Sequence, residues 1–233
     1  MTLASNPGKN PMNVNAHKAT DQIRKWVGDF GRQYTDRNQS SAAELDESYR
    51  TTYGISRTEL NRRFLADVPK NARILEVGCN IGTQLLVLKE MGFSNLSGVE
   101  IQTYAIEQAK ERLQDAQILS ASAFSLPFED KHFDLVFTSG VLIHIAPSDL
   151  PAALTEIHRC CKNWIWGLEY YAPQMTEVVY RGNQDLLWKT DYARLYLDTF
   201  ADLDVVREER LPYLENENVD AMFLLRRRNP HAA

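Results

Sequence analysis

The sequence predicts an α/β protein built on a doubly wound, Rossmann-like sheet of seven mostly parallel strands, with one antiparallel strand near the edge and N-terminal helices forming a lid. Three observations support this fold class. From residue 73 onward, short apolar runs alternate with segments of helical periodicity, as expected for crossover units and a parallel sheet. The first of these runs leads directly into a glycine-containing turn. Two strand patterns with no helix between them end the series.

The N-terminal part of the chain is expected to lie outside the sheet. Residues 1–19 show no apolar periodicity and are expected to be disordered, whereas residues 20–69 are predicted to form the helical lid. Apolar side chains recur at helical spacing in three segments, residues 20–34, 42–53 and 56–65. Gly54 ends the second helix, and Ser56 with Glu59 forms a capping box at the start of the third.

Residues 70–228 are predicted to form the core domain. The expected strands are residues 74–77, 96–99, 118–119, 133–138, 164–168, 205–208 and 221–225. The expected helices are residues 82–91, 103–113, 148–160 and 191–200. Because no helix separates the last two strands, we expect them to pair antiparallel, which places one reversed strand near the edge of a parallel sheet.

Length, composition and charge limit the classes of protein to which this chain can belong. The chain has 233 residues, 44% of them hydrophobic, and a formal net charge of −5, which fits one α/β domain and argues against a nucleic-acid partner. Residues 135–148 lack charge but are shorter than the roughly 20 residues that span a bilayer, and no secretory signal is recognisable. Cys79, Cys160 and Cys161 lack metal-ligand spacing. We expect a cytoplasmic protein that binds no metal and does not attach to a membrane. The oligomeric state does not follow from the sequence.

A nucleotide-type binding turn follows the first expected strand. Residues 74–82 read ILEVGCNIG, a buried strand followed by a turn and a helix start, where backbone amides can approach a ligand closely. Glu100 ends the next strand, where a carboxylate can accept hydrogen bonds from ribose hydroxyls. The dinucleotide fingerprint requires glycine where this chain has Asn80 and Thr83, which argues against a nicotinamide oxidoreductase.

The turn resembles the first motif of class I S-adenosylmethionine-dependent methyltransferases, Glu/Asp-x-Gly-x-Gly-x-Gly. Glu76, Gly78 and Gly82 match this motif, and Asn80 replaces its middle glycine. Asparagine tolerates the left-handed backbone conformation, so the turn is expected to form despite the replacement. The resemblance implies S-adenosyl-L-methionine as the cofactor, with S-adenosyl-L-homocysteine as its product.

The same resemblance implies which residues bind the cofactor. They are Glu76, Gly78, Cys79, Asn80, Gly82, Glu100, Ile101, Ser122, Ala123, Phe124 and Ser139. Many relatives place Asp where this chain has Ser122, so a hydroxyl or the Ala123 amide is expected to replace the carboxylate contact with adenine. Cys79 is interpreted as a buried packing residue rather than a reactive thiol.

The methyl acceptor is expected to meet residues after the fourth and fifth strands. Residues 138–145 read TSGVLIHI and lack the Asn/Asp-Pro-Pro-aromatic motif of enzymes that methylate base nitrogens or amides. His144 in this loop is a candidate general base, and the alternative is a histidine that bonds backbone at a helix start. Residues 170–192 form an insertion rich in tyrosine, tryptophan and cations, which we interpret as a substrate cover. Arg181 and Lys189 in this insertion are candidates to bind a carboxylate or phosphate, or to be solvated loop residues.

Three segments together resemble the methylases associated with pseudaminic acid biosynthesis gene clusters. They are residues 26–38, 180–182 and 187–193. The residues of segment 30–38 make a poor helix end and predict a lid hinge. The resemblance implies that Tyr34, Arg37 and Asn38 fold over the cofactor and acceptor, and Tyr180 is a further candidate for substrate contact. The alternative is a helix terminus whose aromatic side chains only pack. The layout is also similar to that of phosphonate O-methyltransferases.

The first functional hypothesis is therefore a methyltransferase that acts on an oxygen, and with less support a nitrogen, of a small anionic metabolite such as a sugar acid or nucleotide-sugar. His144, Tyr34, Arg181 and Lys189 are the candidate catalytic residues. One alternative is a phosphonate or phosphate O-methyltransferase, whose acceptor oxygen is already anionic and needs positioning but no base. Another is a cofactor-binding scaffold without catalytic activity.

Overall fold

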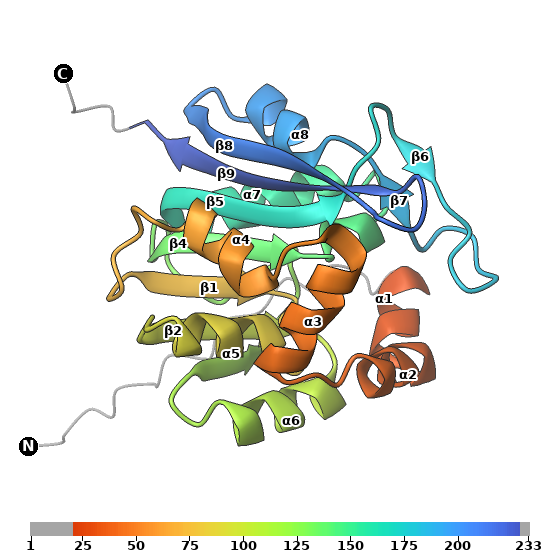
Figure 1. Cartoon of the computed structure of the whole chain (residues 1–233), viewed down its shortest axis with the longest axis horizontal. Helices are drawn as coiled ribbons and strands as arrows, with labels where there is room; N and C mark the ends of the chain where they lie inside the picture. The colour runs from red at the N-terminus through yellow and green to blue at the C-terminus, as the bar shows by residue number, and fades with distance from the viewer. Residues whose placement is uncertain (1–20, 229–233) are drawn as a thin grey trace, which may run out of the picture.

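The computed structural model describes residues 21–228, in which a sheet lies between two layers of helices (Figure 1). The sheet strands in spatial order are β3 (Gln117–Ser120), β2 (Asn95–Glu100), β1 (Arg73–Val77), β4 (Phe133–Ser139), β5 (Cys161–Tyr170), β9 (Val219–Arg227) and β8 (Leu203–Pro212). The strands from β3 to β5 run parallel, and β9 pairs antiparallel with both β5 and β8. The predicted doubly wound sheet with one reversed strand next to its edge is confirmed. The prediction for residues 1–19 lies outside the described residues.

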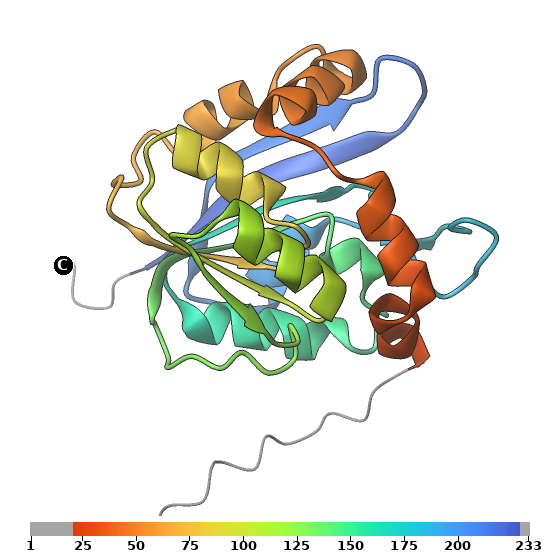
Figure 2. The same ribbon diagram turned by 90° about the horizontal axis from the view of Figure 1, so that it is seen from below.

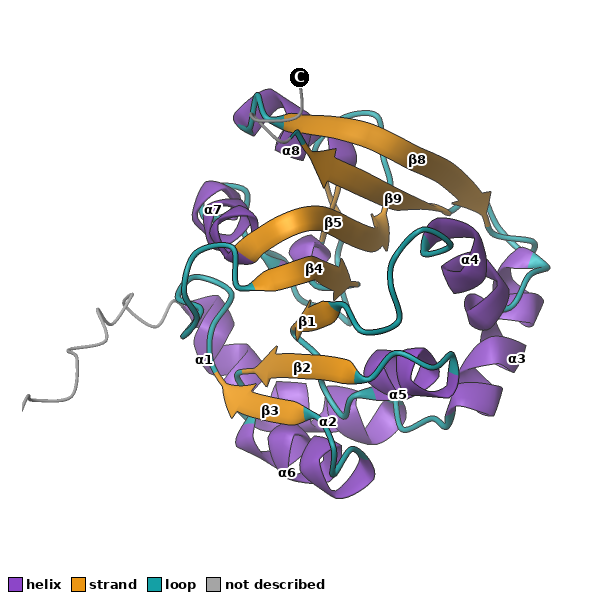
Figure 3. Cartoon of the chain, turned by 90° about the vertical axis from the view of Figure 1, so that its left-hand side faces the viewer, coloured by secondary structure: helices purple, strands orange, loops and turns teal. Residues whose placement is uncertain are grey.

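Helices cover both faces of this sheet (Figure 3). The helices of the core domain are α5 (Thr83–Glu90), α6 (Thr103–Arg112), α7 (Leu150–Cys160) and α8 (Tyr192–Thr199). Alternate side chains of a strand point to opposite faces, so Val136 joins the apolar core under α7 and α8 while Leu135 and Phe137 join the core under α5. No helix within residues 21–228 has both the length and the apolar character needed to cross a membrane.

The predicted helix over residues 20–34 is wrong in its continuity. The structure has two helices there, α1 (Asp21–Val27) and α2 (Asp29–Arg37), which separate at Gly28. Gly31 lets them pack closely, because a Cβ atom at this position would lie 1.8 Å from the Trp26 carbonyl oxygen. Because α2 runs to Arg37, most of residues 30–38, the segment expected to be a hinge, is helical. Asn38 is the residue that caps the end of this helix.

The other two N-terminal helices begin and end close to the predicted positions. They are α3 (Ala42–Tyr53), which ends at Gly54 in the left-handed conformation, and α4 (Arg57–Phe64). The Ser56 side chain accepts the amide of Glu59, as predicted, and a complete capping box that the analysis missed begins α3. Leu60 and Phe64 of α4 are buried in the core with α5. The helical lid over residues 20–69 stays a prediction.

The insertion over residues 170–192 contains a small two-stranded sheet of β6 (Thr176–Glu177) and β7 (Trp188–Lys189). Its tip is a tight turn at Arg181 and Gly182, whose φ angles are 51° and 76°. The two residues lie between paired Tyr180 and Asn183, so both central positions of a two-residue hairpin have positive φ, as in a type I′ turn. This turn fixes Arg181 at the end of the insertion.

The last two strands are longer than predicted, because β8 and β9 continue as an antiparallel ribbon beyond the apolar residues that mark their centres. Much of β8 is exposed, so apolar alternation alone marks only part of it. The ribbon places Asp220 and Tyr213 beside the end of β5.

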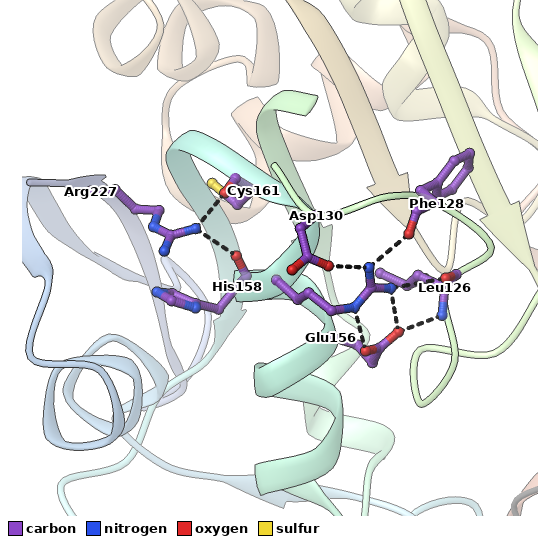
Figure 4. A network of polar contacts seen from close by, with 8 residues as sticks. Leu126, Phe128, Asp130, Glu156, His158, Cys161 and Arg227 are labelled. Atoms are coloured by element: carbon purple, nitrogen blue, oxygen red, sulfur yellow. Dashed lines mark hydrogen bonds and ion pairs between the residues drawn. The ribbon is translucent and has the colours of Figure 1, made fainter. Parts of the chain in front are cut away.

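Arg159 of α7 holds the loop between β3 and β4 (Figure 4). Its guanidinium donates to the carbonyl oxygens of Leu126 and Phe128 at 3.0 and 2.7 Å and to both carboxylate oxygens of Glu156 at 2.8 Å. Glu156 also accepts the Leu126 amide at 2.8 Å, and Asp130 forms an exposed contact at 3.0 Å. The network therefore fixes the loop over residues 121–132, which includes Ser122 and Phe124.

Replacing Arg159 with methionine is expected to lower the free energy of unfolding by about 2–3 kcal/mol, since two carbonyl groups and the Glu156 carboxylate each lose the guanidinium as a hydrogen-bond donor. Urea denaturation measures this loss. Asp130→Asn is the matched control, and its exposed ion pair is expected to contribute less than about 0.5 kcal/mol. Equal losses in the two variants would contradict the assigned role of Arg159.

Candidate active site

A cavity of about 590 Å³ lies where β1, β2 and β4 end. The helices α1 and α2 lie at this end of the strands (Figures 1 and 2). The volume of the cavity is in the range of small-molecule and cofactor sites. All the residues predicted to bind a cofactor line it except Gly82, which lies at the start of α5. The carboxyl ends of parallel strands are where open α/β sheets bind ligands, so this cavity is the candidate active site.

The turn after β1 has the backbone conformation predicted from the sequence. Gly78, Asn80 and Gly82 have φ angles of 74°, 47° and 76°. A Cβ atom on Gly78 would lie 2.7 Å from Val141, and one on Gly82 would lie 2.5 Å from a methyl group of Leu113. The two glycines therefore supply both positive φ and space, and asparagine adopts the left-handed conformation in place of the middle glycine.

Glu100 lies at the end of β2 and faces this turn. One carboxylate oxygen accepts the Ile101 and Gln102 amides at 2.7 and 3.0 Å, and the other accepts the Asn80 amide at 2.9 Å. Burial raises the pKa of Glu100, and these three amides oppose the rise. The second oxygen keeps one lone pair for a ligand hydroxyl. Glu100 thus joins the turn after β1 to the turn after β2 and can also bind a ribose.

Five side chains that line the cavity each have a polar atom without a hydrogen-bond partner within the part of the chain that the structure describes, and two of these atoms belong to β1 and the turn that follows it. They are Oε2 of Glu76 and Oδ1 of Asn80. Both are acceptors, so a ligand that brings hydroxyl or ammonium hydrogens would satisfy them. Burial raises the pKa of Glu76 well above its usual value, and the charge of Arg57 opposes this rise.

Arg57 is a buried cation that the sequence analysis missed. Its guanidinium donates to Asn61 at 2.8 Å, to the Tyr49 hydroxyl at 2.9 Å and to the Ser139 hydroxyl at 3.3 Å, and lies 5.0 Å from the centre of the Trp166 ring. The sequence did contain a signal that Arg57 has a special role. A cation in the first turn of a helix interacts unfavourably with the helix dipole, so an arginine at this position needs another reason to be there. Arg57 links α4 to the end of β4 beside the cavity.

The residues predicted to surround adenine line the same cavity as Glu100. Ile101, Ser122, Ala123 and Phe124 all line the cavity. The Ser122 hydroxyl accepts the amide of Phe124 at 3.3 Å within its own turn. Burial raises the pKa of the Cys79 thiol well above its usual value, so Cys79 is a packing residue rather than a nucleophile.

His144 lines the cavity at the end of the short helix η1 (Leu142–His144). Its Nδ1 lies 2.7 Å from the carbonyl oxygen of Leu186, which can only accept, so Nδ1 carries the hydrogen and Nε2 keeps the lone pair in the neutral ring. Burial lowers the pKa of His144 to about 4. The imidazole is therefore neutral near pH 7 and has one nitrogen able to accept a proton.

Two other elements, β5 and α1, hold the His144 loop. The Glu169 carboxylate of β5 accepts the amides of Val141 and Ile143 at 3.2 and 3.4 Å. Gln22 of α1 donates to the His144 carbonyl oxygen and accepts the Ala146 amide at 3.2 Å. The Trp26 ring of α1 lies 4.4 Å from the imidazole ring. The first helix therefore covers His144 directly.

A second cavity adjoins the first and shares six residues with it. The shared residues are Tyr34, Arg37, Asn38, Gly140, His144 and Tyr170, and the second cavity adds Tyr180 and Arg181 among others. Lys189 does not line either cavity. Its ammonium group donates to Asn218 at 2.6 Å and lies 5.4 Å from the Tyr170 ring centre. The structure therefore brings together every predicted acceptor residue except Lys189.

The buried neutral state of His144 predicts a pH dependence of stability. Its pKa is about 4 when folded and about 6.5 when unfolded, so between these values the unfolded chain binds more protons and stability falls as pH falls. This effect amounts to at most about 3 kcal/mol between pH 6.5 and 4. A His144→Gln variant is expected to lose less stability over this interval in denaturant titrations. Identical slopes in both proteins would contradict a buried neutral imidazole.

Residues 75–164 match a family model described as a methyltransferase domain. This segment of the chain is therefore similar to a methyltransferase domain. It runs from β1 into β5 and includes the glycine turn, Glu100 and His144. The matched segment excludes α1 to α4, the insertion and the β8–β9 ribbon, which supply Arg37, Arg181 and Asp220 to the cavities.

Two curated relatives resemble the domain over part of their length. An uncharacterized methyltransferase of Schizosaccharomyces pombe is 34% identical over 115 residues, and a demethylmenaquinone methyltransferase of Staphylococcus epidermidis is 31% identical over 101 residues. Each alignment covers 41% of this chain and 41% of the relative. The similarity therefore spans about two fifths of each protein and concerns the domain.

Solved structures resemble the fold more completely. A 1,6-didemethyltoxoflavin-N1-methyltransferase of Burkholderia thailandensis, solved with its substrate and S-adenosylhomocysteine, has a TM-score of 0.69 at 16% identity, covering 96% of this chain and 94% of that chain. A magnesium protoporphyrin IX methyltransferase of Synechocystis has a TM-score of 0.64 at 13% identity, covering 91% and 100%. The chain therefore shares the Rossmann-like fold of these two methyltransferases.

Proposed function

We propose that the protein transfers a methyl group from S-adenosylmethionine to an oxygen of a small anionic metabolite. The observation that carries this proposal is the second cavity, which joins His144 to the cations Arg37 and Arg181 beside the candidate cofactor site. Guanidinium groups bind carboxylates and phosphates through paired hydrogen bonds. The resemblance of residues 26–38, 180–182 and 187–193 to methylases associated with pseudaminic acid biosynthesis gene clusters favours a sugar acid or nucleotide-sugar as acceptor.

The residues in the large cavity fit the cofactor. Glu100 has a free lone pair for a ribose hydroxyl, and Glu76 and Asn80 have unsatisfied acceptor atoms in the same wall. Ile101 and the turn after β3 would hold the adenine. When bound, S-adenosylmethionine supplies a methyl group already activated by its sulfonium charge, so the protein has to hold the acceptor, exclude water and move a proton.

His144 is proposed to remove the proton when the acceptor is a hydroxyl. Its Nε2 lone pair is available because Nδ1 is committed to Leu186, and α1 covers the ring. Burial keeps the Tyr34 phenol protonated by raising its pKa, so Tyr34 acts as a hydrogen-bond donor. A phosphonate or phosphate oxygen would need no base, and Arg37 and Arg181 would then position it.

Product formation tests the proposal. Purified protein is incubated with S-adenosylmethionine and with sugar acids, nucleotide-sugars or alkylphosphonates, and methylated product and S-adenosylhomocysteine are measured by mass spectrometry. Turnover is expected with acceptors that carry a carboxylate, phosphate or phosphonate. Cofactor binding without turnover on any of these compounds would instead support an inactive scaffold.

Arg181→Ala is expected to raise the KM for the anionic acceptor about five- to tenfold, with kcat changed less than twofold, because the guanidinium binds ground state and transition state alike. Steady-state kinetics at two salt concentrations measure this, since an exposed charge is screened by salt. Arg194→Ala, an exposed cation of α8, is the matched control. An unchanged KM would remove Arg181 from the acceptor site.

A further inference from the structure

Asp220 is a buried carboxylate that the sequence analysis did not single out. It lies at the start of β9, paired with Tyr170 at the end of β5, and is 2% exposed. Its side chain lines the large cavity at the end away from Glu100 and Ser122. Among the described residues its Oδ1 atom has no hydrogen-bond partner. A buried carboxylate oxygen in a cavity wall needs a hydrogen-bond donor, and the ligand is a natural source of one.

The other oxygen of Asp220 already has donors. The Tyr53 hydroxyl donates to Oδ2 at 2.6 Å, and the Tyr213 hydroxyl donates to the same atom at 3.3 Å. Each phenol has one hydrogen, so these bonds commit both hydrogens to Asp220. The phenolic oxygens of Tyr53 and Tyr213 keep lone pairs, so these two hydroxyls and the Asp220 carboxylate together offer a ligand several acceptor sites. Such a set selects a ligand atom with several hydrogens.

Aromatic rings surround this carboxylate. Tyr49, Tyr53, Tyr170 and Tyr213 all line the cavity with Asp220. The centres of the Tyr49 and Tyr53 rings lie 5.1 Å apart, and those of Tyr53 and Tyr213 also lie 5.1 Å apart. The faces of tyrosine rings attract cations. The wall therefore combines one negative charge with electron-rich rings.

No cation within residues 21–228 forms an ion pair with Asp220. Lys189 is the nearby cation that lowers its pKa, but the ammonium group bonds to Asn218 instead. Burial outweighs this effect and raises the pKa of Asp220 to about 6, so the carboxylate is ionised at pH 7.5. The negative charge inside the cavity is thus available to a ligand.

We infer that Asp220 and the four tyrosines form a subsite that binds a protonated amine of the methyl acceptor. This inference rests on the proposed function, which assigns the Arg37 and Arg181 end of the cavities to an anionic group. The acceptor is then zwitterionic, with its anion near Arg181 and its amine near Asp220. An ammonium group supplies three N–H donors to Oδ1 and the phenolic oxygens and a charge to the rings.

Binding of two probes to the full chain tests this inference. Benzylamine, which is charged at pH 7.5, and benzyl alcohol, its neutral analogue, are titrated calorimetrically with and without saturating S-adenosylhomocysteine. Wild type is expected to bind benzylamine at least about tenfold more tightly than benzyl alcohol. Asp220→Asn is expected to abolish this preference, whereas the exposed Asp204→Asn variant keeps it. S-adenosylhomocysteine is expected to bind all three proteins equally, within about twofold.

Three results would overturn the subsite. The first is equal binding of both probes to wild type, and the second is a preference for benzylamine that survives Asp220→Asn. The third is a loss of S-adenosylhomocysteine affinity in that variant, which would assign Asp220 to the cofactor's own amine. If Asp220→Asn does not fold, Tyr53→Phe replaces it. This variant keeps the carboxylate and releases a lone pair on Oδ2, so the amine preference should be retained or increased, and a decrease would contradict the inference. If S-adenosylhomocysteine does not bind to wild type, the proposed function is refuted. The preference for benzylamine over benzyl alcohol is also measured in the absence of S-adenosylhomocysteine, so it still tests the subsite.

Discussion

Replacement of Glu100 with alanine is expected to weaken the binding of S-adenosylhomocysteine by about 100-fold or more. The Glu100 carboxylate accepts the amides of Asn80, Ile101 and Gln102 and faces the cavity. Hydrogen bonds to a charged acceptor contribute about 1.5–3 kcal/mol each, so their loss releases both turns as well as the expected ribose contact. Isothermal titration calorimetry measures the affinity, and circular dichroism checks that the variant is folded.

Glu100→Gln separates the charge from the shape of this side chain. The amide keeps one acceptor oxygen but turns an N–H group toward a backbone N–H, so an intermediate loss of about tenfold is expected. Glu90→Ala, an exposed carboxylate at the end of α5, serves as the control and should bind normally. An affinity within threefold of wild type in Glu100→Ala would show that the carboxylate neither binds ribose nor supports the turn.

Replacement of His144 with alanine is expected to lower kcat by about 100-fold or more if the acceptor is a hydroxyl, because general-base catalysis contributes about that factor. The KM should change only a few-fold, since the imidazole acts on a proton rather than on the charge of the acceptor. Raising the pH is expected to restore part of the rate, because the hydroxyl then ionises without a base. The pH dependence of kcat for wild type and variant measures both effects.

The same variant distinguishes the two kinds of acceptor oxygen. If the acceptor is a phosphonate or phosphate, whose oxygen is already anionic, the loss in kcat should stay below about tenfold at every pH. His132→Ala, a partly exposed histidine stacked on Phe128, is the control and should have wild-type activity. A 100-fold loss that is independent of pH would contradict the base role and would assign His144 to positioning.

Local patterns were enough to predict the sheet and the cofactor turn. The turn after β1 depends on Gly78, Asn80 and Gly82, whose conformational preferences act within a few residues, and all three have the predicted positive φ. The reversed strand β9 followed from the absence of a helix between two strand patterns. In both cases the cause of the structure lies close to its position in the sequence.

The acceptor side was less predictable because its residues meet through long-range packing. Tyr53 and Asp220 are 167 positions apart and form a 2.6 Å hydrogen bond only because α3 packs beside the β8–β9 ribbon. Arg57 has the sequence context of a surface helix start, yet tertiary packing buries it completely. No local pattern encodes these contacts.

The most direct test of the account is calorimetric titration of the purified, cofactor-stripped protein with S-adenosylhomocysteine, using NADH as the control ligand. The account predicts a dissociation constant of about 1 μM or lower for S-adenosylhomocysteine, equivalent to about −8 kcal/mol, and no binding of NADH. Binding of NADH in its place, or no binding of S-adenosylhomocysteine at several temperatures, would contradict the cofactor site and the function built on it.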